Sequence, residues 1–179
     1  VLKAAQVVCE DGMAIPILLG RKEIILELME TLDFDADTVQ IIDPKHDDEQ
    51  DQLKKYAHEL WKRRKRKGIT YYDAEKLMRE RNYFAAMMVV AGDADAMLSG
   101  YSRAYPSVLK PILEIIGKDP KAKIVAATNL MNTKKGPIFI SDTSINVDPD
   151  AEQLAQIAQM TSFAVKMFGL EPNVAMVSY

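Results

Sequence analysis

Short apolar runs alternate with amphipathic helical patterns along this chain, and that alternation restricts its fold more than any other feature. The runs at residues 16–20, 39–42 and 123–128 have the length and composition of buried strands. Residues 21–32 carry apolar side chains at helical spacing, and residues 53–61 repeat that spacing. Strands that alternate with helices predict an α/β fold with a largely parallel sheet.

Residues 92–117 hold the pattern with the clearest functional content. The apolar run at residues 96–98 predicts a buried strand that stops at Ser99 and Gly100. Pro106 then opens a helical pattern. A strand, a glycine turn and a helix in this order direct backbone N–H groups and the positive end of the helix dipole beyond the carboxyl end of the strand. Open α/β sheets bind their ligands at that place.

A second predicted strand ends in polar residues in the same way. Residues 137–140 form an apolar run. The polar residues Ser141, Asp142 and Thr143 follow it directly. Because the carboxyl ends of parallel strands meet at one edge of a sheet, we expect Gly100 and Asp142 to lie close together in one parallel sheet. The residues therefore predict an α/β domain with an anion-binding or acyl-binding crevice.

Composition and charge argue against several other classes of protein. The formal net charge is −3, whereas general affinity for nucleic acid needs a basic surface, so no nucleic-acid partner is expected. The longest apolar run, residues 84–91, is far shorter than the roughly 20 residues that span a bilayer. The single cysteine, Cys9, cannot form an internal disulfide, which favours a reducing compartment, and we expect the cytoplasm.

Motifs that would name a chemistry are absent from the sequence. His46 and His58 lack metal-ligand spacing, and no metal site is predicted. No dinucleotide-binding fingerprint, phosphate loop or serine-nucleophile elbow is present, so catalytic residues stay unassigned.

Six consecutive basic residues at positions 62–67 precede Gly68 and allow three interpretations. The first is a solvated helix C-terminus, where cations complement the helix dipole. The second is nucleic-acid binding, against which stand the acidic remainder of the chain and the lack of interleaved aromatic residues. The third is that one or two of these residues hold a phosphorylated ligand, since arginine presents a bidentate fork to phosphate oxygens.

The chain is expected to divide at Asp119 into a first sub-domain, residues 1–119, and a second, residues 120–179. Asp148 is expected to cap a helix in the second sub-domain, and residues 174–177 to form a last strand. Ten apolar residues are expected to lie mostly in the core: Met87, Met88, Val89, Met97, Leu98, Ile138, Ile140, Ile157, Val174 and Met176.

Beyond these general patterns, several spans match a known family in collinear order. They are residues 16–20, 64–70, 92–96, 99–100, 110–111, 141–146, 149–155 and 168–178. Together they resemble the phosphate acetyl/butyryltransferase family over essentially the whole chain, and their combination is specific although no single span is. Within the family, residues 79–89 and 100–106 look most like the C-terminal domain of bifunctional bacterial NADP-dependent malic enzymes, which is fused behind a decarboxylating malate dehydrogenase domain.

The resemblance implies two sub-domains, each with three α/β/α layers, and a cleft between them for coenzyme A and acyl phosphate. By the same resemblance, Arg64 matches an arginine implicated in that cleft. Lys110 stands where genuine transacetylases usually carry arginine before the proline, and lysine keeps the charge but loses the bidentate fork. Residues 102–105 replace the small Ser/Thr-containing loop of active transacetylases with a sequence that carries arginine and tyrosine. The family's first strand is expected before Val1, and further cleft residues after Tyr179.

Three functions follow from the resemblance as expectations. The first, which the changed loop and Lys110 favour, is a regulatory, non-catalytic acetyl-CoA-binding domain of an NADP-dependent malic enzyme. The second is an active phosphate acetyltransferase. The third is a structural oligomerisation module, compatible with the first because family members resemble one another in pairing as dimers.

The resemblance also implies the ligands and partners of this domain. The ligand would be an acyl-CoA or acyl phosphate, the protein would be a homo-oligomer, and NADP and a divalent metal would belong only to the malate-oxidising domain of the parent protein. The residues expected to bind the ligand are Arg64, Ser99, Gly100, Arg103, Lys110, Ser141, Asp142 and Thr143.

Overall fold

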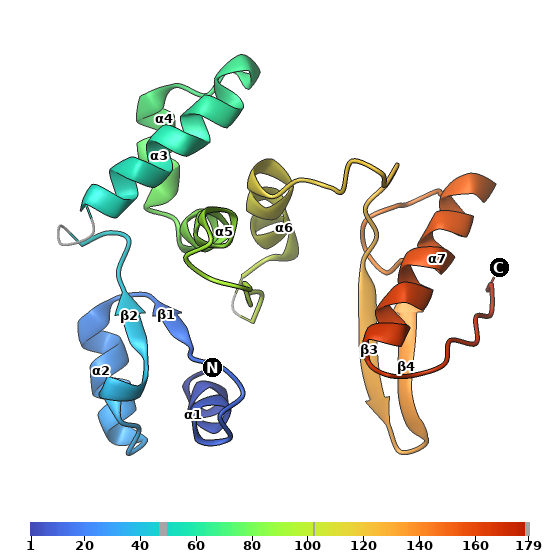
Figure 1. Ribbon diagram of the computed structural model, residues 1–179, viewed down its shortest axis with the longest axis horizontal. Helices are drawn as coiled ribbons and strands as arrows, with labels where there is room; N and C mark the ends of the chain where they lie inside the picture. Colours follow the sequence, from blue (N-terminus) through green and yellow to red (C-terminus); the bar gives the residue numbers. More distant parts are fainter. Residues whose placement is uncertain (47–49, 102, 178–179) are drawn as a thin grey trace. The chain divides into compact units, whose positions relative to one another are not determined.

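The computed structural model describes residues 1–46, 50–101 and 103–177. The chain forms two compact units, Val1–Gly117 and Lys118–Tyr179 (Figure 1). Ser102 and Ser178, which belong to spans discussed above, lie outside the described residues. The division into family sub-domains at Asp119 stays a prediction. No helix among the described residues combines the length and the apolar character that crossing a membrane requires.

The described part of the first unit is mostly helical and contains one pair of strands. Its elements are α1 (Leu2–Glu10), β1 (Ile17–Leu19), α2 (Lys22–Thr31), η1 (Ala36–Thr38), β2 (Gln40–Ile42), α3 (Gln50–Arg64), η3 (Lys65–Lys67), α4 (Tyr71–Met78), α5 (Arg81–Ala91) and α6 (Tyr105–Ile115). β1 and β2 pair in parallel, with Ile17 opposite Gln40 and Leu19 opposite Ile42, and α2 connects them. The predicted sequence of strand, helix and parallel strand is confirmed here.

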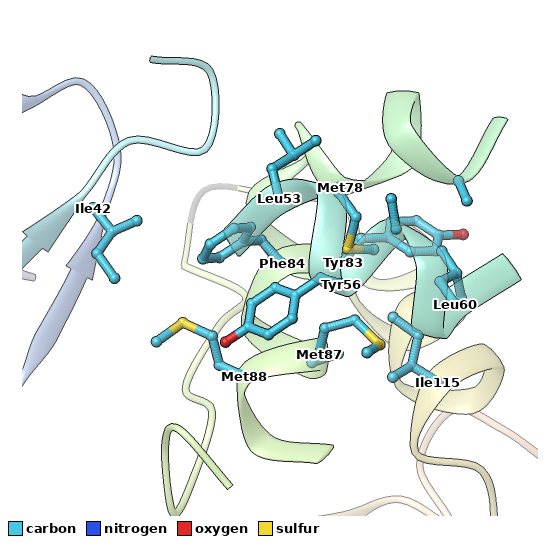
Figure 2. Packing of buried hydrophobic residues seen from close by; sticks show 13 residues of the cluster. Ile42, Leu53, Tyr56, Leu60, Met78, Tyr83, Phe84, Met87, Met88 and Ile115 are labelled. Carbon is cyan, nitrogen blue, oxygen red and sulfur yellow. The ribbon is translucent and has the colours of Figure 1, made fainter. Parts of the chain in front are cut away.

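The main core of the first unit forms where α3, α4 and α5 pack together (Figure 2). α3 contributes one apolar face, because Leu53, Tyr56 and Leu60 recur at helical spacing. The rings of Tyr56 and Phe84 meet edge to face, with their centroids 5.1 Å apart. Methionine, which adapts to irregular space, fills the surroundings of these rings. The buried methionines of this cluster are Met78, Met87 and Met88.

A second, smaller apolar cluster holds the parallel strand pair to its helices. Leu18 of β1 and Met29 of α2 are buried in it, together with Ala5 of α1 and Phe34. Each strand of the pair is only three residues long. Packing against α1 and α2 therefore has to supply stability that so short a ladder cannot supply alone.

Local capping signals set where several helices begin and end. Thr70 and Asp73 form a capping box at the start of α4, in which each side chain accepts a hydrogen bond from the backbone N–H of the other residue. Gly92 ends α5 with φ +79°, a left-handed conformation that a residue without Cβ adopts at little cost.

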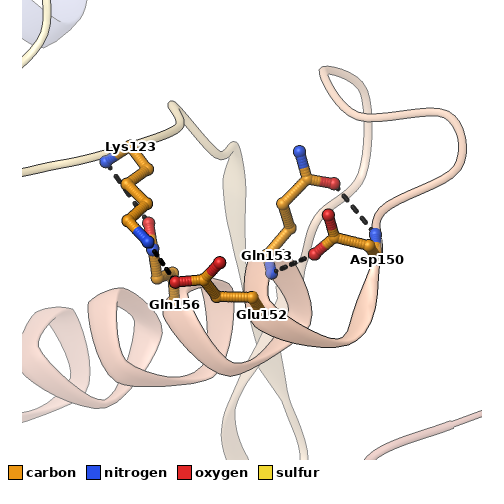
Figure 3. Close-up of polar contacts among 5 residues, drawn as sticks. All are labelled: Lys123, Asp150, Glu152, Gln153 and Gln156. Atoms are coloured by element: carbon orange, nitrogen blue, oxygen red, sulfur yellow. Dashed lines mark hydrogen bonds and ion pairs between the residues drawn. The ribbon is translucent and has the colours of Figure 1, made fainter.

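The described part of the second unit contains a hairpin and one long helix. β3 (Thr128–Thr133) and β4 (Gly136–Ser141) pair antiparallel, and α7 (Ala151–Met167) contacts β4. Asp150 and Gln153 form the capping box of α7 (Figure 3). The ammonium group of Lys123 pairs with Glu152, and the backbone N–H of Lys123 donates to Gln156 Oε1 at 3.3 Å. Glu152 and Gln156 therefore attach the chain at Lys123 to the first turns of α7.

The prediction that one parallel sheet joins strands ending at Ser99 and Ser141 is wrong. Residues 96–98 are irregular, and no strand among the described residues pairs with them. An apolar run forms a strand only when a neighbouring strand satisfies its backbone N–H and C=O groups. β4 is antiparallel to β3 because only two residues separate them, whereas a parallel connection needs a crossover of a dozen or more.

Three further boundaries in the second unit differ from prediction. The strand expected at residues 123–128 begins only at Thr128, and residues 174–177 form no strand. The cap of the last helix is Asp150 and not Asp148, because the Asp150 side chain accepts the N–H of Gln153. A strand thus forms where a neighbouring strand can accept its backbone hydrogen bonds, and a cap forms where the side chain can reach a backbone N–H of the first helical turn.

The predicted core is correct in the first unit for α5 and largely wrong for the second unit. Met87, Met88 and Ile157 are buried, and Val89 and Met97 are partly buried. The five remaining residues are exposed in this chain: Leu98, Ile138, Ile140, Val174 and Met176.

The structural cause of the exposure at Ile138 is that only one face of the two-stranded hairpin is covered. Phe139 packs edge to face on Phe168, with ring centroids 5.4 Å apart. Ile138 and its cross-strand partner Met131 project from the opposite face, and both are about half exposed. On β4 the period of two therefore leaves Ile138 and Ile140 exposed on either side of the partly buried Phe139, whereas on β3 Leu130 and Met131 are both exposed.

The main core generates a stability prediction. Leu60 is fully buried among α3, α4 and α5, so Leu60→Ala should lower the free energy of unfolding by about 2–5 kcal/mol through lost burial and the cavity that remains. Leu98→Ala is the matched control, because Leu98 is fully exposed and should change the free energy by no more than about 0.5 kcal/mol. Urea unfolding followed by circular dichroism measures both, and equal effects would contradict this assignment of the core.

Candidate functional site

Arg64, the arginine that the family resemblance selects, forms an internal ion pair. Its Nη2 lies 3.1 Å from Glu114 Oε1, and the two side chains are 15% and 19% exposed. The hydroxyl of Tyr83 donates to the other oxygen, Glu114 Oε2, at 2.5 Å. Burial, followed by this hydrogen bond and the charge of Glu114, raises the pKa of Tyr83 well above its ordinary value. Arg64 thus connects the end of α3 to α5 and α6.

The Nε of Arg64 takes no part in this network. It is buried and has no hydrogen-bond partner among the described residues. A buried donor without a partner is costly, so Arg64 has one unused donor beside the pair with Glu114.

The irregular segment at residues 96–100 is attached to the helices on either side of it. Ser99 Oγ donates to Asn82 Oδ1 at 2.8 Å, and the amide nitrogen of Asn82 donates to the carbonyl of Ser107 at 3.3 Å. Asn82 belongs to the first turn of α5, and Ser107 to the first turn of α6. Gly100 has φ +119° with open space where a side chain would project, so the turn that was expected there does need glycine.

Lys110 lies on the solvent side of α6. Its side chain is exposed and makes no ion pair with a described carboxylate. The next residue, Pro111, is fully buried inside the helix. Lys110 therefore presents its charge to solvent, while the next residue along α6, Pro111, faces the core.

Arg103 lines a crevice of about 590 Å³ in the first unit. The crevice lies at the carboxyl ends of β1 and β2, which are followed by Gly20 and by Asp43. The start of α2 and the junction of α4 with α5 complete its polar part. Five cationic and two acidic residues line it: Arg21, Lys45, Arg79, Arg81, Arg103, Asp43 and Glu80. Ligands of α/β proteins bind beyond the carboxyl ends of parallel strands, so this is the expected place in the fold, at a strand pair other than the one predicted.

Arg81 lies beside Gly20 in the lining of this crevice. A Cβ built on Gly20 would lie 3.8 Å from Arg81 Nη1 and 3.2 Å from Ile25 Cδ1. The helices α2 and α5 both begin here, with Arg21 and Glu80 as N-caps whose side chains make no capping hydrogen bond. The start of a helix carries positive partial charge, and the starts of both helices belong to the lining of the crevice.

Sequence reasoning missed four of the five crevice cations: Arg21, Lys45, Arg79 and Arg81. A signal for Arg21 was present, because it directly follows a predicted strand and its glycine and opens a predicted helix, the pattern used above for residues 96–106. Arg79 and Arg81 carried no comparable signal, since only the turn between α4 and α5 brings them to the same place. Arg64, Ser99 and Lys110 do not line the crevice.

In the second unit, Asp142 organises the loop after β4. One carboxylate oxygen accepts the N–H of Ala127 at 2.9 Å, and the other accepts the backbone and side-chain N–H groups of Asn146 at 2.7 and 2.6 Å. Partial burial alone would raise the pKa of Asp142, but these bonds and that from the N–H of Ser144 outweigh it, so the pKa lies below its ordinary value.

The two neighbours of Asp142 differ in their surroundings. The hydroxyls of Ser141 and Thr128 are 2.5 Å apart across the hairpin, and Thr143 is exposed. Gly100 belongs to the first unit and Asp142 to the second, and their proximity stays a prediction.

The whole chain, residues 1–179, matches the phosphate acetyl/butaryl transferase family, and the chain therefore belongs to that family. It is 37% identical over 185 residues to a phosphate acetyltransferase of Thermoanaerobacterium thermosaccharolyticum, covering 99% of this chain and 55% of the relative. It is 34% identical over 182 residues to an NADP-dependent malic enzyme of Haemophilus influenzae, covering 99% of this chain and 24% of the relative.

Solved structures agree with this assignment. A phosphotransacetylase of Streptococcus pyogenes matches with a TM-score of 0.87 at 33% identity, covering 99% of this chain and 54% of that one. The predicted mixed α/β fold with a parallel sheet is thereby confirmed. The chain spans between about a quarter and about half of the length of these relatives.

The Arg64 network generates a prediction about coupled residues. Arg64→Met leaves the largely buried carboxylate of Glu114 with only Tyr83 as its partner, and should lower the free energy of unfolding by about 1–4 kcal/mol. The double variant R64M/E114L should be less destabilised than the sum of the two single variants, because the unpaired charge is removed. A double-mutant cycle of urea unfolding measures the coupling, and strict additivity would show that the pair contributes nothing.

Asp142 generates a pH-dependent prediction. Because its pKa is lower in the folded state than in the unfolded state, its stabilisation is complete above the unfolded-state pKa and is lost as the pH falls through the folded-state pKa. Asp142→Asn places an NH₂ group against N–H donors, so it should destabilise the protein at pH 7 and less so in acid. Asp148→Asn is the matched control, an exposed carboxylate without a hydrogen bond to a described residue. Melting temperatures between pH 3 and 7 test this, and parallel curves for D142N and the parent protein would refute it.

Proposed function

We propose that this chain is the phosphotransacetylase-like domain of an NADP-dependent malic enzyme, and that it binds acetyl-CoA as a regulatory and oligomerisation module. The observation that carries the proposal is the state of Arg64, which is ion-paired with Glu114 while lysine occupies position 110. An arginine neutralised in this way has less charge to offer to the phosphate that accepts or releases the acetyl group, and Lys110 lacks the bidentate fork of arginine. Binding without efficient turnover is the function that this arrangement favours.

Coenzyme A and acyl phosphates are polyanions, so their site needs cations together with backbone donors. Arg103 and Lys110 carry charges that no described carboxylate neutralises, and Gly100 supplies an unobstructed backbone turn between Ser99 and α6. Asp142, with Ser141 and Thr143, would contribute polar groups from the second unit. Malic enzymes are among the homologues, which supports the proposed parent protein.

The remaining parts of the proposal concern the whole protein. It would act in the cytoplasm as a homo-oligomer, and NADP and a divalent metal would be bound by the malate-oxidising domain of the parent. The large exposed apolar residues of the second unit, among them Phe163 and Met167, favour contact with further protein.

The alternative function is an active phosphate acetyltransferase, which moves an acetyl group between coenzyme A and phosphate. A specific observation favours it: phosphate acetyltransferases are as similar to this chain as malic enzymes are, at 36% and 37% identity against 33% and 34%. Lys110 also retains the positive charge of the family position.

A pair of assays on the intact protein separates the two functions. With the regulatory function, acetyl-CoA should change the malate concentration needed for half-maximal oxidation by roughly 5–150-fold, the size of a typical coupling of 1–3 kcal/mol. Acetyl phosphate formation from acetyl-CoA and phosphate should be weak or absent. Lys110→Gln should weaken acetyl-CoA binding, whereas Lys62→Gln, an exposed lysine of α3, should leave it unchanged.

The opposite result would decide for the alternative. Robust acetyl phosphate formation, together with malate oxidation that ignores acetyl-CoA or is absent, would identify an active transacetylase. Equal effects of the Lys110 and Lys62 variants would remove Lys110 from the site.

A further inference from the structure

The run of basic residues at positions 62–67 is only partly used by the fold. Arg63 Nε lies 2.8 Å from Glu59 Oε1, and Arg64 is paired with Glu114. The other four residues of the run are exposed and form no ion pair with a described carboxylate: Lys62, Lys65, Arg66 and Lys67. The C-terminal dipole of α3 favours cations only within the last turn, which ends at Arg64. A solvated helix end therefore does not account for the cations of η3.

The structure brings aromatic rings to this run, although the sequence places none inside it. The ring centroid of Trp61 on α3 lies 5.7 Å from that of His58 and 6.4 Å from that of Tyr71 on α4. Lys65 Nζ lies over the Trp61 ring, 5.1 Å from its centroid. Because α3 and α4 pack side by side, the three rings form one group where the two helices meet (Figure 1). His58 and Tyr71 are exposed there, so part of this group faces solvent.

The exposed cations and the rings follow one face of α3 and continue into η3. His58, Trp61 and Lys65 are spaced by three and four residues, which places them on the same side of the helix. Lys54 and Lys62 lie four residues before and after His58 and extend this face. From Lys54 to Lys65 the face is about 16 Å long, at the helical rise per residue. With one residue of α4 it forms a surface that we call the α3–α4 seam: Lys54, His58, Trp61, Lys62, Lys65 and Tyr71.

An acidic protein segment fits this seam better than a nucleic acid does. The chain carries a formal charge of −3 in spite of its six consecutive cations, so the rest of the chain repels a long polyanion. Bases stack on the free faces of aromatic rings. Lys65 covers one face of Trp61, and the Tyr71 ring meets the indole at 85°, so these rings are engaged with their neighbours. Carboxylates need only the lysine ammonium groups and no flat ring face.

We propose that the α3–α4 seam docks a segment of a partner protein that is rich in Asp and Glu and carries at least one apolar side chain. The carboxylates pair with Lys54, Lys62 and Lys65, and the apolar side chain contacts the rings of His58 and Trp61. A face of about 16 Å matches roughly five residues of extended chain. This interaction goes beyond the proposed function, because it uses a different ligand and none of the residues assigned to acetyl-CoA.

Fluorescence anisotropy of labelled peptides on the intact protein tests the seam. The probe is a peptide of about twelve residues, with leucine at every fourth position and glutamate elsewhere, and the control peptide has glutamine in place of glutamate. Wild type should bind the glutamate peptide about tenfold or more tightly than the glutamine peptide. Lys62→Glu and Lys65→Glu should each weaken this binding about fivefold or more. Lys3→Glu makes the same charge change at an exposed position of α1 outside the seam and should alter binding less than about twofold.

Trp61 supplies a second measurement at the seam itself. It is the only tryptophan of the sequence, and the difference in emission between the wild type and Trp61→Phe isolates its signal in the intact protein. The glutamate peptide should change this difference, and the glutamine peptide should not. Lys62 and Lys65 are exposed, so their variants carry little risk to the core. Far-UV circular dichroism and melting temperature identify any variant that has lost its fold.

Each result has a defined meaning. The inference is overturned if the glutamate peptide binds no more tightly than the glutamine peptide, if K3E weakens binding as much as K62E and K65E do, or if the Trp61 signal stays constant. Single-stranded RNA that binds through the same lysines more tightly than the peptide would make the seam a nucleic-acid surface and would also overturn it. Displacement of the peptide by coenzyme A would assign the seam to the acetyl-CoA site instead. Weakened peptide binding in K62E and K65E, with acetyl-CoA binding unchanged, is the result expected.

Discussion

The first unit depends on how its two large core tyrosines satisfy their hydroxyl groups. Tyr56 and Tyr83 bury their rings among α3, α4 and α5, and a buried hydroxyl without a partner would cost about 1–3 kcal/mol. Tyr56 donates to Asp93, immediately after α5, and Tyr83 donates to Glu114 on α6. These bonds join the apolar core to the segment that carries Ser99, Gly100 and Lys110, so the position of that segment follows from the packing of the core.

The cations of the first unit are in two electrostatic states, and this difference separates structural from functional charge. Arg64 is largely buried, is neutralised by Glu114 and holds three helices together. The crevice cations are exposed and have no described carboxylate partner. Desolvation makes an unpaired buried charge costly, whereas an unpaired charge in an open crevice stays hydrated until an anion replaces the water. The family pattern selects Arg64 and Lys110, and the distribution of charge selects Arg21 and Arg81 as well.

Much of the fold could be predicted, because helices and caps depend on neighbours in the sequence. The apolar face of α3, the Thr70 cap and the parallel pair of β1 and β2 around α2 all follow from local spacing. The strand expected at residues 96–98 failed, because Met97 packs on the core without any described strand beside it. The pairing of β3 with β4 was not predicted, because a strand was expected at residues 123–128 whereas β3 extends from Thr128 to Thr133 and leaves only two residues before β4.

The sequence by itself determined the family, the order of most helices and the identity of the buried faces, since these depend on residue types and on spacing within a few turns. Only the tertiary structure decided which apolar runs became strands and which cations were paired, since both outcomes require partners that are distant in the chain. Glu114 neutralises Arg64 only because α6 packs near the end of α3. Arg21, Arg81 and Arg103 form one crevice only because the β1–β2 pair, the α4–α5 junction and the loop before α6 converge.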